Sequence, residues 1–242
     1  MEQHFNGKTV LVTGAGWGIG AATALLYAAS GAKVIVSDTS RKGGKNTLAK
    51  IKDQKGHAIY IQADVSCQAA CEELIKTTIQ AFGSIDIACN NSAVICETPD
   101  RTNGNMKSFD HQSGLNLSSL TNCMQYEIEA MQKHRGGIII NTLSILGAIG
   151  TASSTRYIET KYGTETLPHN FRGEYPAIHI HTIAPTFIAT ALLKERSLQK
   201  MEGKINPFSM DSHATIQEVA RLILWLSSDE SHRMSTVFND AN

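Results

Sequence analysis

Short apolar runs alternate along the chain with longer amphipathic stretches, and this alternation constrains the fold more than any other feature. The apolar runs predict strands over residues 9–12, 33–37, 58–62, 85–89, 137–142 and 178–183. Helical patterns cover residues 21–30, 46–54, 69–82, 124–133 and 216–226. Strands separated by helices of this length pair in parallel through right-handed crossovers. We therefore expect a single α/β domain over residues 1–242, built on a doubly wound parallel sheet with helices on both faces.

Composition narrows the classes of function. The formal net charge is +0, and this neutral balance gives no indication of binding to nucleic acid or an anionic membrane. Its apolar runs are too short to span a bilayer, and residues 1–8 are too polar for a signal peptide. Five cysteines without a CxxC pair favour a reducing, cytoplasmic location. Cys67 and Cys71 are one helical turn apart, but no histidine or second pair completes a metal site, so we expect no metal.

A glycine-rich stretch follows the first expected strand directly and opens a helix. It reads Thr13-Gly14-Ala15-Gly16-Trp17-Gly18-Ile19-Gly20. Glycines permit a tight turn and let the backbone approach a pyrophosphate, while the free N–H groups and the dipole of the helix attract that anion. A flexible turn would carry the same glycines, but the position between strand and helix favours a Rossmann-like dinucleotide site.

Asp38 ends the second expected strand, about twenty residues beyond the glycines. A carboxylate at this position can accept hydrogen bonds from an adenosine ribose and repels a 2′-phosphate. It therefore predicts NAD as the cofactor rather than NADP. Arg41 and Lys42 lie close by and could still serve a phosphate, so NADP remains the less favoured alternative.

The spacing of these glycines resembles the TGxxxGIG motif of the short-chain dehydrogenase/reductase family, in its branch of about 250 residues. Asp64-Val65 resembles the family's adenine-contacting pair, and residues 90–93 (NNSA) resemble its NNAG. Residues 185–190 resemble its PGxxxT segment. The resemblance implies that the cofactor is bound by Gly14, Trp17, Gly18, Ile19, Gly20, Asp38, Asp64, Val65, Asn91, Tyr157, Lys161, Pro185, Ile188 and Thr190.

Tyr157 and Lys161 are four residues apart, which places both side chains on one face of a helix. A neighbouring ammonium lowers the pKa of a tyrosine, which can then exchange a proton with an alcohol or ketone as general acid or base. Ser144 lies at the end of a buried strand, where its hydroxyl would hold the substrate oxygen. The resemblance implies that Asn116 positions a water beside Lys161. A tyrosine and lysine exposed on a helix are the alternative.

Three features depart from the family pattern. Ala93 and Thr186 stand where the family has glycine, and both add bulk beside the expected nicotinamide. Pro168 interrupts a stretch that the family uses as a long helix for subunit contacts. We expect a homo-oligomer, either a dimer or a tetramer, although the interrupted helix and a short C-terminus bring the tetramer into doubt.

The expected substrate pocket is apolar and takes a small molecule, which favours an alicyclic, aromatic or steroid-like alcohol or ketone. Its predicted lining is Ser144, Leu146, Ile95, Thr186 and Leu192, with a substrate loop over residues 190–213. Two alternatives stay open: a dinucleotide-binding scaffold or sensor with impaired catalysis, and an NADPH-dependent 3-oxoacyl reductase. A metal site at His179 and His181, and a hydrolase triad around Asp110, His111 and Ser113, are weaker hypotheses, the latter because no GxSxG motif occurs.

Overall fold

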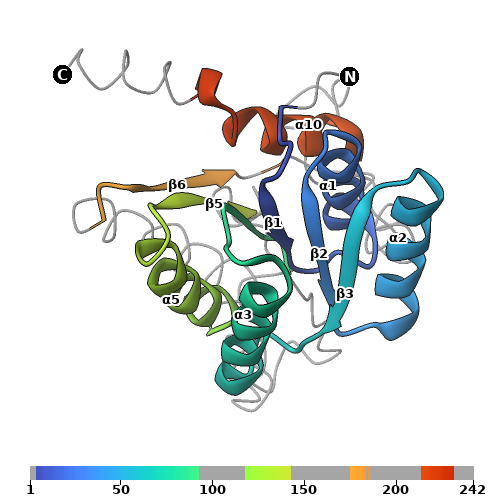
Figure 1. Cartoon of the computed structure of the whole chain (residues 1–242). Coiled ribbons are helices and arrows are strands. Elements are labelled where there is room, and N and C mark those ends of the chain that lie inside the picture. Colours follow the sequence, from blue (N-terminus) through green and yellow to red (C-terminus); the bar gives the residue numbers. More distant parts are fainter. Residues whose placement is uncertain (1–3, 93–117, 143–174, 184, 186–213, 232–242) are drawn as a thin grey trace, which may run out of the picture.

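The computed structural model describes residues 4–92, 118–142, 175–183, 185 and 214–231. Within these residues lies a six-stranded sheet in the order β3-β2-β1-β4-β5-β6, and every neighbouring pair is parallel. The doubly wound α/β fold predicted from the sequence is therefore confirmed (Figure 1). The elements are β1 (Thr9–Val12), α1 (Gly18–Ala29), β2 (Lys33–Asp38), α2 (Arg41–Asp53), β3 (His57–Gln62), α3 (Gln68–Phe82), β4 (Ile87–Asn90), α5 (Ser119–Gln132), β5 (Gly137–Thr142), β6 (Ile178–Ile183) and α10 (Ile216–Leu226).

Two apolar cores sandwich the sheet, because successive strand residues point to opposite faces. On one face, Val10 and Val12 of β1 join a core with buried residues of α1, α2 and α10. On the other face, Leu11 joins a core with buried residues of α3 and α5. Figure 1 shows α1, α2 and α10 on one side of the strands and α3 and α5 on the other. Within the described residues, no helix is long and apolar enough to cross a membrane.

The predicted strands and helices all occur, but several begin elsewhere. Helix α2 starts at Arg41 rather than residue 46, because Ser40 caps it by accepting a hydrogen bond from the N–H of Gly43 at 3.1 Å. Position 44 inside this helix is a glycine because a Cβ there would overlap the ring of Tyr60 on β3. Helices α1 and α5 also start earlier than expected, at Gly18 and Ser119, and β4 starts later, at Ile87. For α2, the cap and the packing of Gly44 decide the start of the helix, and helix propensity alone does not reveal them.

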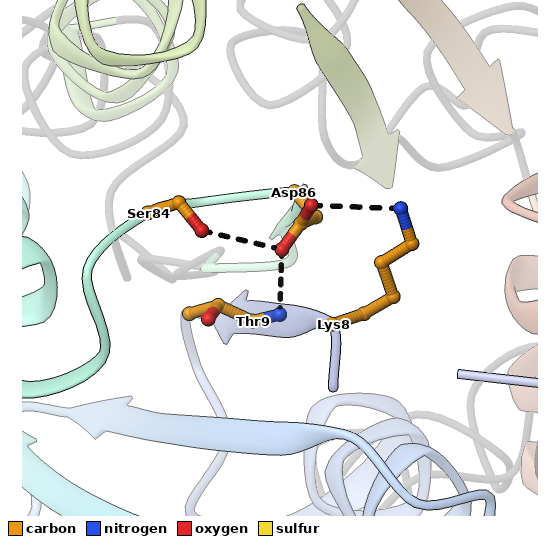
Figure 2. A network of polar contacts seen from close by, with 4 residues as sticks. All are labelled: Lys8, Thr9, Ser84 and Asp86. Carbon is orange, nitrogen blue, oxygen red and sulfur yellow. Dashed lines mark hydrogen bonds and ion pairs between the residues drawn. The ribbon is translucent and has the colours of Figure 1, made fainter. Parts of the chain in front are cut away.

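The amino ends of β1 and β4 are joined through Asp86, which precedes β4. Its Oδ2 accepts a hydrogen bond from the N–H of Thr9 at 2.8 Å and another from the hydroxyl of Ser84 at 3.4 Å. Its Oδ1 lies 3.6 Å from Nζ of Lys8 (Figure 2). The network fixes the middle of the sheet at the edge opposite the glycine loop, which leaves the carboxyl ends of the strands for ligand binding.

Candidate functional site

The carboxyl edge of the sheet gathers the described residues that the sequence assigned to a dinucleotide. Parallel strands end at the same edge, and each of these segments follows a strand: the glycine loop follows β1, Asp38 ends β2, Asp64 and Val65 follow β3, Asn91 follows β4, and Pro185 follows β6. The strand order reverses between β1 and β4, which are neighbours in the sheet. Ligands of open α/β sheets bind in the crevice at such a reversal.

The glycine loop folds closely against the end of β4. Gly14 has a positive φ of 61°, and a Cβ there would lie 3.1 Å from Cα of Ser92. A Cβ on Gly20 would overlap the carbonyl oxygen of Gly14. Asn91 holds this arrangement, because its N–H donates to Oγ1 of Thr13 at 3.2 Å and its Nδ2 donates to the Gly14 carbonyl at 3.4 Å. Glycine is therefore required at both positions by close backbone contact.

The first turn of α1 is left open to a ligand. The N-cap residue Trp17 provides no side-chain hydrogen bond to the helix, and the residue is 57% exposed. The Ala21 N–H donates to the carbonyl of Trp17, so the N–H groups before Ala21 precede the helical hydrogen-bond pattern. Gly18 has a φ of 55°, and no atom of the described residues would lie within 4 Å of a Cβ built there. Free amides, open space and the positive end of the helix dipole fit a pyrophosphate.

Asp38 is fixed against the glycine loop and is only 7% exposed. Its Oδ2 accepts the N–H of Gly16 at 2.8 Å, and its Oδ1 accepts the N–H of Ser40 at 2.7 Å. The hydroxyl of Tyr60 donates to the Asp38 carbonyl at 3.0 Å, which secures the backbone as well. Each carboxylate oxygen keeps a second lone pair for a ligand hydroxyl. Sequence reasoning placed Asp38 at this site but missed its bond to the loop, because no residue spacing encodes it.

The turn after β3 is held from α5. Asp64 is exposed, and its Oδ1 accepts bonds from the N–H of Ser66 at 3.0 Å and the hydroxyl of Ser66 at 2.6 Å. Val65 is buried, and Nδ2 of Asn122 donates to the Val65 carbonyl at 3.4 Å and to the Ser66 carbonyl at 3.2 Å. These hydrogen bonds connect the turn to α5, and the roles of Asp64 and Val65 toward adenine stay predictions.

A buried polar cluster beneath this edge was missed from the sequence. Nδ2 of Asn90 donates to Oε2 of Glu127 at 2.9 Å and to Oδ1 of Asn141 at 3.1 Å. Glu127 and Asn141 have no exposed surface, and burial raises the pKa of the Glu127 carboxyl to about 7. A signal was present in the sequence: Glu127 stands in the apolar stripe of α5, seven residues after Leu120 and four before Met131.

The predicted catalytic residues lie outside the described residues, so their arrangement stays a prediction. This holds for Asn116, Ser144, Tyr157 and Lys161, for the nicotinamide-end residues Ile188 and Thr190, for the pocket residues Ile95, Leu146, Thr186 and Leu192, and for the loop over residues 190–213.

Cysteines and histidines form no metal site in the part of the chain that the structure describes, where no group of three or more potential ligands occurs. Cys67 is exposed and Cys71 is buried, so the two are separated by environment despite their spacing. Cys71 instead faces Cys123 across α3 and α5, with 3.8 Å between the sulfur atoms. His179 and His181 alternate along β6 with Ile178 and Ile180, which face the core under α5.

The fold and this edge together define a dinucleotide-binding α/β protein, and comparison with known proteins gives its family. Residues 8–201 match the family model described as short chain dehydrogenase, and the chain belongs to this family. Its members bind a nicotinamide dinucleotide, which agrees with the open helix start and the glycine contacts above.

Two relatives and one solved structure illustrate the similarity. The chain is 34% identical to the short chain dehydrogenase/reductase astE of Aspergillus oryzae, across 94% of this chain and 91% of the relative. It is 30% identical to a cyclohexanol dehydrogenase of Acinetobacter sp., across 96% of this chain and 92% of the relative. The crystal structure of levodione reductase matches with a TM-score of 0.84 and 27% identity, covering 94% of this chain and 93% of that one.

Proposed function

We propose that this oxidoreductase uses NAD(H) and transfers a hydride between the nicotinamide and a secondary alcohol or ketone. The observation that carries the choice of cofactor is the fixed carboxylate of Asp38 at the end of β2. Both of its oxygens are held by backbone N–H groups, so the side chain cannot turn away from a ligand bound over the glycine loop. A ribose hydroxyl can donate to it, whereas a 2′-phosphate would meet a fixed negative charge.

The chain's own residues divide the binding task at this edge. The first-turn amides of α1 take the pyrophosphate, and Asp38 takes the adenosine ribose. Asn91 keeps the glycine loop in shape through its bonds to Thr13 and Gly14. The bound nicotinamide supplies the hydride acceptor or donor. We place the Tyr157 phenol as the group that gives or takes the alcohol proton, with Lys161 lowering its pKa and Ser144 holding the substrate oxygen.

We propose an alicyclic, aromatic or steroid-like substrate. The apolar residues expected around the pocket support this class, as does the similarity to a cyclohexanol dehydrogenase, whose name states an alicyclic alcohol.

The test is turnover with NAD and a panel of secondary alcohols that begins with cyclohexanol, followed through NADH formation. We expect oxidation by the native protein and a loss of rate of at least about 100-fold in Tyr157→Phe, since general acid–base catalysis contributes about that much or more. NADH binding by the variant should persist. Binding of NADH without turnover of any alcohol or ketone in the panel would instead establish the scaffold or sensor alternative.

A further inference from the structure

The buried carboxyl of Glu127 has no role in the reaction proposed above, yet it is bonded to the segment that shapes the dinucleotide site. It lies on α5 with no exposed surface. Asn90, which it contacts, is the last residue of β4 and directly precedes Asn91. Asn91 in turn makes two hydrogen bonds to the glycine loop, at Thr13 and Gly14. One uninterrupted path of bonds therefore connects Glu127 with the loop over which the pyrophosphate would lie.

Two buried oxygen atoms of the cluster lack a hydrogen-bond partner in the described part of the chain, and whether a donor is present between them depends on whether the Glu127 carboxyl is protonated. Oε1 of Glu127 and Oδ1 of Asn90 are buried and have no hydrogen-bond partner among the described residues. A neutral carboxyl carries an O–H that can donate, whereas a carboxylate only accepts. When Glu127 ionises, its Oε1 and the Oδ1 of Asn90 are therefore both acceptors, and neither can donate to the other. An unmatched charge in a buried site is also far less favourable than a neutral acid.

Ionisation of Glu127 would also change the strength of its hydrogen bond with the side-chain amide of Asn90. Its amide nitrogen is shared between Oε2 of Glu127 at 2.9 Å and Oδ1 of Asn141 at 3.1 Å. Hydrogen bonds to an ionised acceptor are shorter and about twice as strong as those to a neutral one. A charged Glu127 would draw the amide toward α5, and the adjoining Asn91 is the residue that holds the glycine loop.

The surroundings of Glu127 offer no compensating charge within the described residues, where burial and the Asn90 bond are the causes that act on its pKa. The titratable groups around it are Cys123 on α5, Cys71 on α3 and Cys89 on β4. The pKa of Cys89 is raised to about 12 by burial, and that of Cys123 is well above its usual value, so neither thiol ionises near neutral pH. Strand β5 has no titratable residue, and the histidines of β6 alternate with the residues that face α5.

We propose that Glu127 is a positioning residue of the dinucleotide site, and that its neutral form favours dinucleotide binding while its ionised form weakens it. This rests on the proposed dinucleotide function of the glycine loop. The direction follows from charge as well as from geometry. The pyrophosphate is an anion, and a second negative charge at the same end of the sheet disfavours it. By linkage, a bound dinucleotide must then favour the protonated form of Glu127.

The experiment measures the dissociation constant of NADH by calorimetry between about pH 6 and about pH 8.5, a range that spans the titration of a carboxyl with a raised pKa. The native protein should lose about fivefold or more in affinity across this range, the lower end of typical coupling between sites. Glu127→Gln keeps the size and an acceptor for Asn90 but cannot ionise, so its affinity should be nearly independent of pH and equal to that of the native protein at low pH.

A second measurement uses the native protein alone and is independent of how the variant folds. Infrared difference spectra on adding NADH near neutral pH should show a gain of protonated carboxyl, since binding favours the neutral acid. An unchanged pH dependence in Glu127→Gln, or a native protein without pH dependence and without carboxyl protonation, would overturn the role of Glu127 while leaving dinucleotide binding intact. Absence of NADH binding at every pH would overturn the proposed function itself, and this inference with it.

Discussion

The backbone N–H of Gly16 donates to Oδ2 of Asp38 across 2.8 Å, which ties the glycine loop after β1 to the end of β2. The same contact explains why residue 16 is a glycine, since a Cβ there would lie 2.8 Å from that carboxylate oxygen. The loop and the predicted ribose-binding carboxylate are thus one unit, and a change in either should affect cofactor binding through the other.

Gly16→Ala tests this unit. The added methyl group would crowd the Asp38 carboxylate, and overpacking of this kind lowers the free energy of unfolding by about 1–3 kcal/mol. Displacement of Asp38 should lower the affinity for NADH by about tenfold or more, which is the equivalent of about 1.4 kcal/mol. Calorimetric titration with NADH measures this affinity.

The matched control is Gly83→Ala at the end of α3, where φ is 90° and a Cβ would have no neighbour within 4 Å in the described part of the chain. It strains the backbone by about 1 kcal/mol away from the site, so NADH affinity should not change. Equal losses of affinity in the two variants would show that Gly16 acts only through overall stability.

The Asp86 network predicts unequal effects for its two charged partners. Asp86→Ala leaves the buried N–H of Thr9 without its acceptor and should lower the free energy of unfolding by about 1–3 kcal/mol. Lys8→Ala removes only an exposed ion pair and should cost at most about 0.5 kcal/mol. Urea denaturation of both variants checks this. A larger loss in Lys8→Ala than in Asp86→Ala would contradict the assignment of the carboxylate as a backbone acceptor.

Glu127 predicts a pH dependence of stability. Its pKa is about 7 in the folded protein against an ordinary value of 4.5, so the folded state holds a proton that the unfolded state has lost between these values. The contribution of this group to the free energy of unfolding is therefore greatest below about pH 4.5. It falls by about 3 kcal/mol as the pH rises to about 7 and stays at the lower value above that pH.

Glu127→Gln should remove this slope. Relative to the native protein, the variant should be similar in stability in acid and more stable above neutral pH, because it buries no charge. Thermal or urea unfolding at a series of pH values measures the difference between the two proteins. A difference that does not vary with pH would show that Glu127 does not titrate in the folded state.

Sequence reasoning recovered the order and type of the elements because the hydrophobic periodicity is strong, and it set β1, β5, β6 and α10 at their observed bounds. It placed the start of α2 wrongly because Gly43 and Gly44 have low helix propensity, whereas Ser40 caps the helix and Gly44 is needed beside Tyr60. Such packing between distant segments has no local signature.

In the candidate site, too, some features could be predicted from the sequence and others could not. The glycine loop and Asn91 follow strands and Asp38 ends one, so their convergence at one edge could be predicted from the parallel topology alone. The bonds of Asp38 to Gly16 and of Glu127 to Asn90 join residues 22 and 37 positions apart, and no pattern of spacing specifies them. Both depend on how tightly helices and loops pack against the sheet.

The central claim, that a fixed Asp38 selects NAD(H), is tested most directly by titrating the native protein and Asp38→Ser with NADH and with NADPH. Serine is smaller than aspartate and carries no charge, so it removes the repulsion of a 2′-phosphate. The native protein should bind NADH at least about tenfold more tightly than NADPH, and Asp38→Ser should lose most of this preference, since close like charges disfavour the phosphate. Equal or tighter binding of NADPH by the native protein would contradict the account.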